Sequence, residues 1–193
     1  MKKLALFASG NGTNVQQITE YFAGNDGIMV DCVIVNRKNI YVIERAKNLC
    51  VDCFYFSKED FYQTDNVLQL LRSRDIDFIV LAGFLWLIPQ NLLDAYNHKI
   101  INIHPALLPS YGGKGMYGHH VHEAVIASHE KESGITIHYV NEHYDRGSII
   151  FQAKCQIEKG DSAEDLAAKI HNLEKKYYPK IIEQVVLHDS ING

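Results

Sequence analysis

The sequence predicts an α/β protein of one domain, with a mostly parallel sheet and an antiparallel C-terminal extension. Three observations support this fold class. Short β-branched runs alternate with helical segments over residues 3–103, which is typical of a parallel sheet. After about Gly134 two strands follow each other with no helix between them. The 193 residues, 47% hydrophobic and 22% charged, suffice for one buried core without disulfides.

The parallel half is expected to alternate strictly between strand and helix. Strands are expected at 3–8, 29–35, 53–56, 78–82 and 100–103, and helices at 13–22, 41–49 and 57–71. Ser57, with Asp60 three residues later, forms a capping box that begins the last of these helices. Such alternation implies right-handed crossovers between parallel strands.

The C-terminal part breaks this pattern. Strands are expected at 135–140 and 148–156, and only the seven residues 141–147 separate them. Because this connection is too short for a crossover helix, the pair is expected to be antiparallel. Ser162, with Asp165 three residues on, begins a final helix, which Pro179 is expected to kink or divide.

Composition excludes several classes of protein. The net charge of −4 and the lack of a long basic run argue against nucleic-acid binding. No apolar run is long enough to span a membrane. The apolar run after Lys2 and Lys3 ends at Gly10, too early for a signal peptide, so a first strand and a cytoplasmic location are expected. Cys50 and Cys53 form a lone C-x-x-C, for which buried reduced thiols are favoured over a zinc or redox site.

A glycine-rich loop, S-G-N-G-T-N at 9–14, follows the first strand and begins the first helix. Gly10 and Gly12 allow a tight turn and close approach of the backbone to a ligand, and the helix N-terminus attracts anions. Val15 stands where a dinucleotide fingerprint has its third glycine, and no Walker lysine follows. A phosphate monoester therefore fits better than NAD or ATP, with a plain strand-to-helix turn as the alternative.

Polar side chains interrupt the strand expected at 100–103. Asn102 and His104 alternate with apolar residues, so both point to the same face, at the strand end where α/β sheets bind ligands. Histidine can carry a proton and asparagine can donate to an oxyanion. Asp145 would pair with His104 and favour its charged form if the turn 141–147 folds over this strand. Satisfied polar groups and an ordinary turn aspartate are the alternatives.

Two further segments have no single interpretation. The glycine-rich segment 112–118 is either a mobile lid or a flexible connector. His119, His120 and His122 are compatible with a metal site, but an exposed loop that enters a helix is favoured.

Residues 102–109, N-I-H-P-A-L-L-P, closely resemble the N-I-H-P-S-L-L-P signature of the 10-formyltetrahydrofolate-dependent formyltransferases. The loop 9–14 is similar to that of the members that act on glycinamide ribonucleotide, and 82–84 and 145–147 match as well. This resemblance extends to about Pro179. It implies a Rossmann-like formyltransferase fold over 1–193, with a nucleotide-phosphate half at about 1–100 and a folate and catalytic half at about 101–193.

The same resemblance implies an activity and a site. The formyl group of 10-formyltetrahydrofolate would pass to the amine of glycinamide ribonucleotide in de novo purine biosynthesis, without a metal. The catalytic residues would be Asn102, His104 and Asp145. His104 would be charged, Asp145 would orient it, and Thr136 would support this region. Phosphate and ribose would bind to Asn11, Gly12, Thr13, Asn14 and Glu174. Folate would bind to Lys58, Phe84, Leu85, Trp86, Leu87, Ile88, Asn102, Val140, Asn141 and Asp145.

Two positions depart from the family pattern around the glutamate tail of the folate. Trp86 stands where many relatives have arginine, and a lysine at position 58 cannot pair with a carboxylate in a bidentate manner. A formyltetrahydrofolate hydrolase, a sugar formyltransferase and a non-catalytic nucleotide-binding module are the alternative functions. The expected partners are small molecules, and both a monomer and a homodimer are compatible with the sequence.

Overall fold

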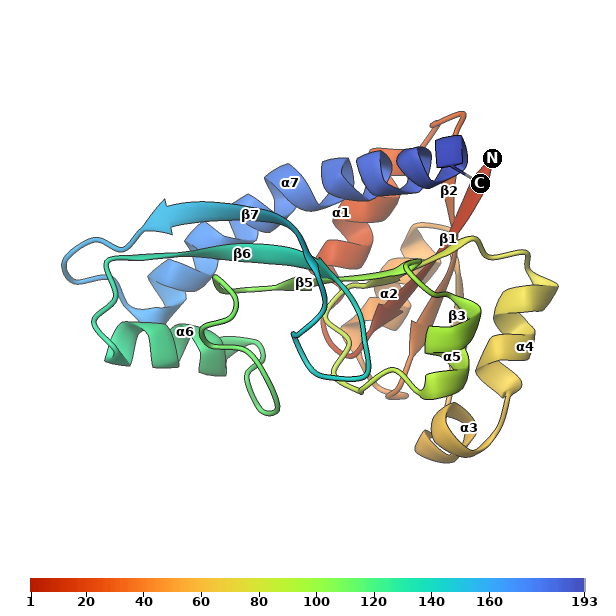
Figure 1. Ribbon diagram of the computed structural model, residues 1–193, viewed down its shortest axis with the longest axis horizontal. Helices are drawn as coiled ribbons and strands as arrows, with labels where there is room; N and C mark the ends of the chain where they lie inside the picture. The colour runs from red at the N-terminus through yellow and green to blue at the C-terminus, as the bar shows by residue number, and fades with distance from the viewer. Residues whose placement is uncertain (193) are drawn as a thin grey trace.

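In the computed structural model, which describes residues 1–192, a seven-stranded sheet runs in the order β3-β2-β1-β4-β5-β6-β7 (Figure 1). The parallel strands are β1 (Lys2–Ala8), β2 (Ile28–Val35), β3 (Asp52–Tyr55), β4 (Phe78–Leu81) and β5 (Ile100–His104). Strand β6 (Glu132–Tyr139) runs antiparallel to β5, and β7 (Ile149–Gln156) runs antiparallel to β6. The predicted fold class and antiparallel pair are confirmed.

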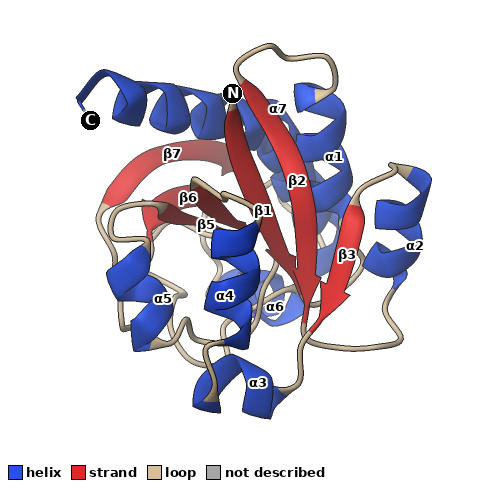
Figure 2. Ribbon diagram, turned by 90° about the vertical axis from the view of Figure 1, so that its right-hand side faces the viewer, coloured by secondary structure: helices blue, strands red, loops and turns tan. Residues whose placement is uncertain are grey.

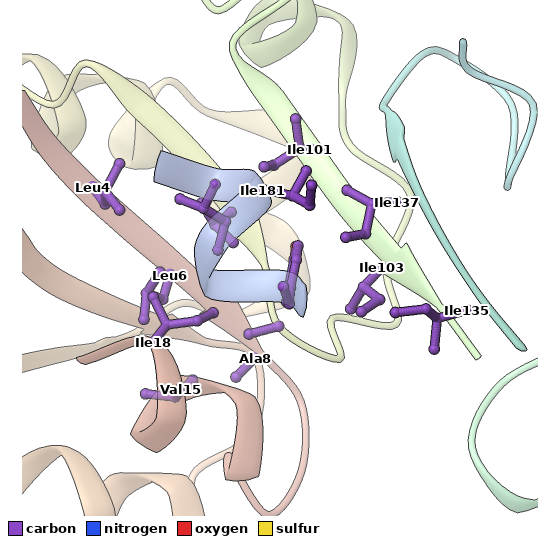
Figure 3. Close-up of a cluster of buried hydrophobic side chains, with 14 of the residues drawn as sticks. Leu4, Leu6, Ala8, Val15, Ile18, Ile101, Ile103, Ile135, Ile137 and Ile181 are labelled. Atoms are coloured by element: carbon purple, nitrogen blue, oxygen red, sulfur yellow. The ribbon is translucent and has the colours of Figure 1, made fainter. Parts of the chain in front are cut away.

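Helices cover both faces of the sheet, because successive side chains of a strand point to opposite sides. One face packs against α1 (Thr13–Phe22), α2 (Tyr41–Asn48), α6 (His119–Ala127) and α7 (Ala163–Asn192). The other packs against α3 (Lys58–Gln63), α4 (Asn66–Ser73) and α5 (Gln90–Ala95) (Figure 2). Within β1, Leu4 and Leu6 face the first group and Phe7 the second. Figure 3 shows the first core, where Ile181 of α7 lies among side chains of the sheet.

The helix predicted over 57–71 is wrong as one element, because it breaks after α3. Thr64 has extended backbone angles, φ −132° and ψ 169°. Its hydroxyl donates to the carbonyl of Asp60 and accepts from the N–H of Asn66. These short polar side chains compete with the helical backbone for hydrogen bonds, which ends α3 and lets α4 begin in a new direction. The capping box of Ser57 and Asp60 is confirmed.

The final helix is continuous. The Ser162 hydroxyl accepts from the N–H of Asp165 at 3.1 Å, and the Asp165 carboxylate accepts from the N–H of Ser162 at 2.9 Å. This reciprocal cap confirms the predicted helix start. Pro179 lies inside α7 and does not divide it. Helix α5, by contrast, was not expected from the sequence.

The topology fixes where a ligand site can form. Strand β1 lies between β2 and β4, so the chain changes direction across the sheet at β1. The carboxyl ends of β1, β2 and β3 meet at one edge (Figure 2), and parallel pairing places those of β4 and β5 at the same edge. Open α/β sheets bind ligands at such a point. Among the described residues, no helix is both long and apolar enough to cross a membrane.

Gly134 in β6 gives a test of the antiparallel extension. A Cβ atom there would lie 2.0 Å from the backbone oxygen of Ala153 in β7. We expect Gly134→Ala to lower the free energy of unfolding by about 1–3 kcal/mol, because the two strands must separate. Gly10→Ala is the control, since its Cβ would meet no atom within 4 Å. Urea unfolding measures both, and equal stability of the two variants would contradict the register.

Candidate active site

A cavity of about 530 Å³ lies at the carboxyl ends of the central strands, within the size range of small-molecule sites. The loops after β1, β4 and β5 contribute to it, together with the turn before β7 and one side of α7. Its lining consists of 10–14, 81–88, 102–105, 113–118 and 143–145, with His122, His138, Val140, Asn141, His171 and Glu174.

The structure brings the predicted site residues together at this cavity, with two exceptions. Lys58 is the first residue of α3 and is not part of the lining. Thr136 is fully buried behind it. Its hydroxyl donates to the carbonyl of Ala106 at 2.7 Å and accepts from the N–H of Leu108 at 3.0 Å. Thr136 therefore fixes the turn that follows β5 and does not face the cavity.

Asn102, His104 and Asp145 form a compact polar cluster with a fourth residue, His138. Nδ1 of His104 lies 3.5 Å from one carboxylate oxygen of Asp145, and Nε2 of His138 lies 3.6 Å from the other. The side-chain amide of Asn102 is 3.1 Å from Nε2 of His138. The N–H of Gly113 donates to Asp145 at 2.8 Å. Asp145 thus stands between two imidazoles.

His138 was missed in the sequence, although a signal for it exists. Thr136 and His138 alternate with Ile135 and Ile137, which is the same period that identified Asn102 and His104 on β5. The antiparallel register pairs Asn102 with His138 across the two strands. Two polar faces that lie on neighbouring strands therefore meet at the same end of the sheet.

The turn that carries Asp145 folds back over the sheet. Asp145 has φ 55°, a left-handed conformation that aspartate tolerates better than most residues. At Gly147, a Cβ atom would lie 1.7 Å from the carbonyl oxygen of Tyr139. Only glycine permits this close approach of turn and strand, so Gly147 helps to hold Asp145 over β5 and β6.

Contacts to backbone carbonyls fix the tautomers of both imidazoles. Nε2 of His104 is 2.8 Å from the carbonyl of Tyr111, and Nδ1 of His138 is 2.8 Å from the carbonyl of Tyr139. A carbonyl can only accept, so each of these nitrogens carries a proton. In the neutral rings, Nδ1 of His104 and Nε2 of His138 are then free to accept.

Burial governs the charge of His104. It lowers the pKa of His104 below the ordinary value of 6.5, although Asp145 and the carbonyl of Tyr111 act in the opposite direction. This direction favours a neutral ring in the free protein, and the expected charge on His104 in the reaction stays a prediction. Burial alone would raise the pKa of Asp145, but His138, His104 and the N–H of Gly113 outweigh it and lower this pKa.

The glycine-rich loop meets α7 in a second part of the cavity. Gly12 has φ 76° and stands directly before α1, so the first N–H groups of this helix lie at the cavity. The amide of Asn14 donates to the carboxylate of Glu174 at 3.2 Å. Glu174 is 8% exposed, and burial raises its pKa to about 7, although the bond from Asn14 lowers it.

An apolar slot forms the third part of the cavity. Phe84 packs against Phe61 of α3, and Trp86 packs against Phe61 and Tyr62. The loop after β4, which forms the slot, is tied to the glycine-rich loop. The hydroxyl of Ser9 accepts from the N–H of Leu85 at 2.9 Å, and its N–H donates to the carbonyl of Gly83 at 3.0 Å.

The histidine-rich segment differs from the sequence prediction. His119, His120 and His122 belong to α6 itself, not to an exposed loop before it. His119 and His120 are exposed near Glu123, while His122 is 4% exposed and lines the cavity. Burial lowers the pKa of His122 to about 4, and His171, His119 and His104 add to this effect. The periodicity of α6 is weak, which hid this helix start in the sequence.

Comparison with known proteins extends this description. A sequence model of the family described as Formyl transferase matches residues 2–182. The chain is 37% identical to phosphoribosylglycinamide formyltransferase of Bacillus subtilis, over 96% of this chain and 95% of the relative. It is 40% identical to the chloroplastic enzyme of the same name from Vigna unguiculata, over 94% of this chain. The chain spans 60% of the Vigna protein and 64% of the corresponding Arabidopsis thaliana protein.

Solved structures are similar over the same extent. The crystal structure of glycinamide ribonucleotide transformylase 1 from Geobacillus kaustophilus has a TM-score of 0.87 and 38% identity, and covers 96% of this chain and 99% of that one. The phosphoribosylglycinamide formyltransferase from Streptococcus pneumoniae has a TM-score of 0.84 and 34% identity, over 96% and 99%.

Glu174 makes stability depend on pH. Because its pKa is raised from 4.5 to about 7, the folded protein binds more protons than the unfolded chain between these values, and stability falls as pH rises. Glu174→Gln keeps an acceptor for Asn14 and removes the ionisable group. As pH rises from 5 to 8, we expect the free energy of unfolding of the variant to increase by on the order of 1–3 kcal/mol relative to that of wild type.

Urea unfolding at the two pH values measures this difference. Glu164→Gln is the control, because it also removes a carboxylate from α7. The side chain of Glu164 is 76% exposed. The same pH dependence in wild type and Glu174→Gln would show that Glu174 ionises normally in the folded protein.

Proposed function

Since the chain belongs to the formyl transferase family and, within it, to the phosphoribosylglycinamide formyltransferases, we propose that it formylates glycinamide ribonucleotide. The formyl group comes from 10-formyltetrahydrofolate, and the reaction is a step of de novo purine biosynthesis. One observation carries this proposal. Asn102, His104 and Asp145 line one cavity together with the glycine-rich loop 10–14 and the apolar loop 84–88.

The two substrates then occupy different parts of the cavity. The phosphate lies on residues 11–14, where the N-terminus of α1 attracts an anion. The ribose hydroxyls donate to Glu174, which lies beside this loop. The flat pterin fits the slot at 84–88, with Val140 and Asn141 opposite. This assigns the nucleotide phosphate mainly to the half 1–100, and the catalytic groups to the half 101–193, which also contributes to the folate site.

The proposed chemistry is a direct transfer. The amine nitrogen of the ribonucleotide bonds to the formyl carbon, and the bond from that carbon to N10 of the folate breaks. The amine loses a proton, and N10 gains one. Asn102 donates its amide hydrogen to the formyl oxygen as negative charge develops there. This donor is held ready at the cavity by its contact with His138.

His104 handles the proton. Its Nδ1 is the ring nitrogen that can accept, because Nε2 already donates to the carbonyl of Tyr111. Asp145, 3.5 Å away, stabilises the imidazolium that results, and this charge in turn stabilises the oxyanion. In this scheme His104 becomes charged during the reaction, and the charged ring then stabilises the oxyanion, as the resemblance implies. No metal takes part in this scheme.

A cytoplasmic location is part of the proposal. Residues Lys2–Ala8, whose lysines and apolar run resemble the start of a signal peptide, form the inner strand β1 between β2 and β4. They are therefore needed in the folded sheet. The proposal is compatible with both a monomer and a homodimer, as the sequence predicted.

Replacement of Asp145 tests the proposed reaction. With 10-formyl-5,8-dideazafolate and glycinamide ribonucleotide, absorbance follows release of the deformylated folate. We expect Asp145→Asn to lower kcat by about 10²- to 10⁴-fold, because His104 loses the charge that stabilises its protonated form. Glu142→Gln is the matched control, since Glu142 lies in the same turn with its side chain 64% exposed.

The alternatives predict other results. Release without the ribonucleotide would identify a hydrolase, and release only with an amino sugar would identify a sugar formyltransferase. Tight ribonucleotide binding with no release would leave a binding module. Undiminished turnover in Asp145→Asn would reject the assignment of the catalytic cluster.

A further inference from the structure

Arg45 of α2 contacts the glycine-rich loop from the side away from the cavity. Its Nε donates to the carbonyl of Asn11 at 2.8 Å, and its guanidinium also bonds to the side-chain oxygen of Gln16. The guanidinium lies 4.8 Å from the ring centroid of Tyr41. Arg45 is not part of the cavity lining, whereas Asn11 and Gly12 are. The loop therefore lies between Arg45 and the cavity.

A second contact directs the carbonyl of Gly10 toward α2, like that of Asn11. The N–H of Val42, in the first turn of α2, donates to the carbonyl of Gly10 at 3.3 Å. The fit between loop and helix is tight, because a Cβ atom on Gly12 would lie 2.4 Å from the Val42 side chain. The carbonyls of Gly10 and Asn11 are thus both directed toward α2.

Peptide geometry links these outer contacts to the cavity. The peptides that join Gly10, Asn11 and Gly12 are trans, so each carbonyl points away from the N–H that follows it. With both carbonyls directed toward α2, the N–H groups of Asn11 and Gly12 point to the opposite, cavity side. Successive N–H groups on one side of the chain form a concave anion site, and the left-handed Gly12 is typical of it.

We infer that Arg45 is a positioning residue for the phosphate of the ribonucleotide. It holds the Asn11–Gly12 peptide so that its N–H points at the phosphate, and the phosphate itself does not touch Arg45. This inference rests on the proposed function, because it requires the phosphate to lie on residues 11–14. Arg45 therefore acts on recognition of one group of the substrate and not on the reacting atoms.

A substrate without the phosphate separates this role from a general structural one. Wild type, Arg45→Gln and Arg45→Lys are each assayed with glycinamide ribonucleotide and with glycinamide riboside, its dephosphorylated form. We expect Arg45→Gln to raise KM for the ribonucleotide about 10- to 100-fold, the loss typical of a hydrogen bond from a charged group, with kcat nearly unchanged. Its kcat/KM for the riboside should equal that of wild type. Arg45→Lys keeps the charge and should lose less.

Lys47→Gln is the matched control, because it removes a positive charge from an exposed position of the same helix. It should leave KM for both substrates unchanged. Activity of each variant on the riboside shows that the variant is folded, and thermal unfolding confirms it.

The outcomes distinguish this inference from the proposed function. If wild type uses ribonucleotide and riboside equally well, the phosphate site itself is wrong, and the role of Arg45 fails with it. If wild type strongly prefers the ribonucleotide and Arg45→Gln keeps the full preference, only the inference about Arg45 is overturned. It is also overturned if Arg45→Gln lowers activity on both substrates by the same factor.

Discussion

The cavity depends on one interaction, the position of the Asp145 carboxylate between the imidazoles of His104 and His138. His104 and His138 are 3% and 2% exposed, so the nearby carboxylate, and not water, stabilises positive charge on either ring. Each ring gives one nitrogen to a backbone carbonyl and turns the other toward Asp145. The turn over 141–147, the β5–β6 register and the tight approach of Gly147 all serve to bring this carboxylate to the sheet.

The same arrangement sets the chemistry. Burial disfavours charge on His104, while Asp145 favours it, and burial dominates in the free protein. A neutral ring with one accepting nitrogen is suited to take a proton during a reaction, at a place where the charge that forms is stabilised at once. The sheet topology brings the anion-binding loop and the apolar slot to the same edge, and Ser9 joins the two by hydrogen bonds to 83–85.

Local sequence patterns predicted the parts of the fold that depend on local physics. Alternation of β-branched runs with helical periods identified the parallel strands, and the short connection at 141–147 identified the antiparallel pair. The pairing of Asp145 with His104 was expected only if the turn 141–147 folds over β5, and the family resemblance, not the local pattern, favoured it. The single helix over 57–71 was wrong because hydrogen bonds of Thr64 and Asn66, which periodicity does not report, end α3.

The features of the site that the sequence did not reveal depend on tertiary contacts. His138 becomes a neighbour of Asn102 only through the pairing register of β5 and β6. His122 is buried because α6 packs against α7, which its sequence neighbours do not reveal. Lys58 lies at the start of α3, outside the cavity lining, so its assignment to the folate, which came from the family resemblance, stays a prediction. The charge of His104 depends on how deeply it is buried, a quantity that no motif encodes.

The most direct test of this account is the pKa of His104, measured by NMR titration of ¹⁵N-labelled imidazoles in wild type and in Asp145→Asn. We expect a pKa below 6.5 in the free wild-type protein, and a further decrease in the variant, because the attraction of Asp145 is lost while burial persists. A pKa above 6.5 in wild type, or one that does not change in Asp145→Asn, would contradict it.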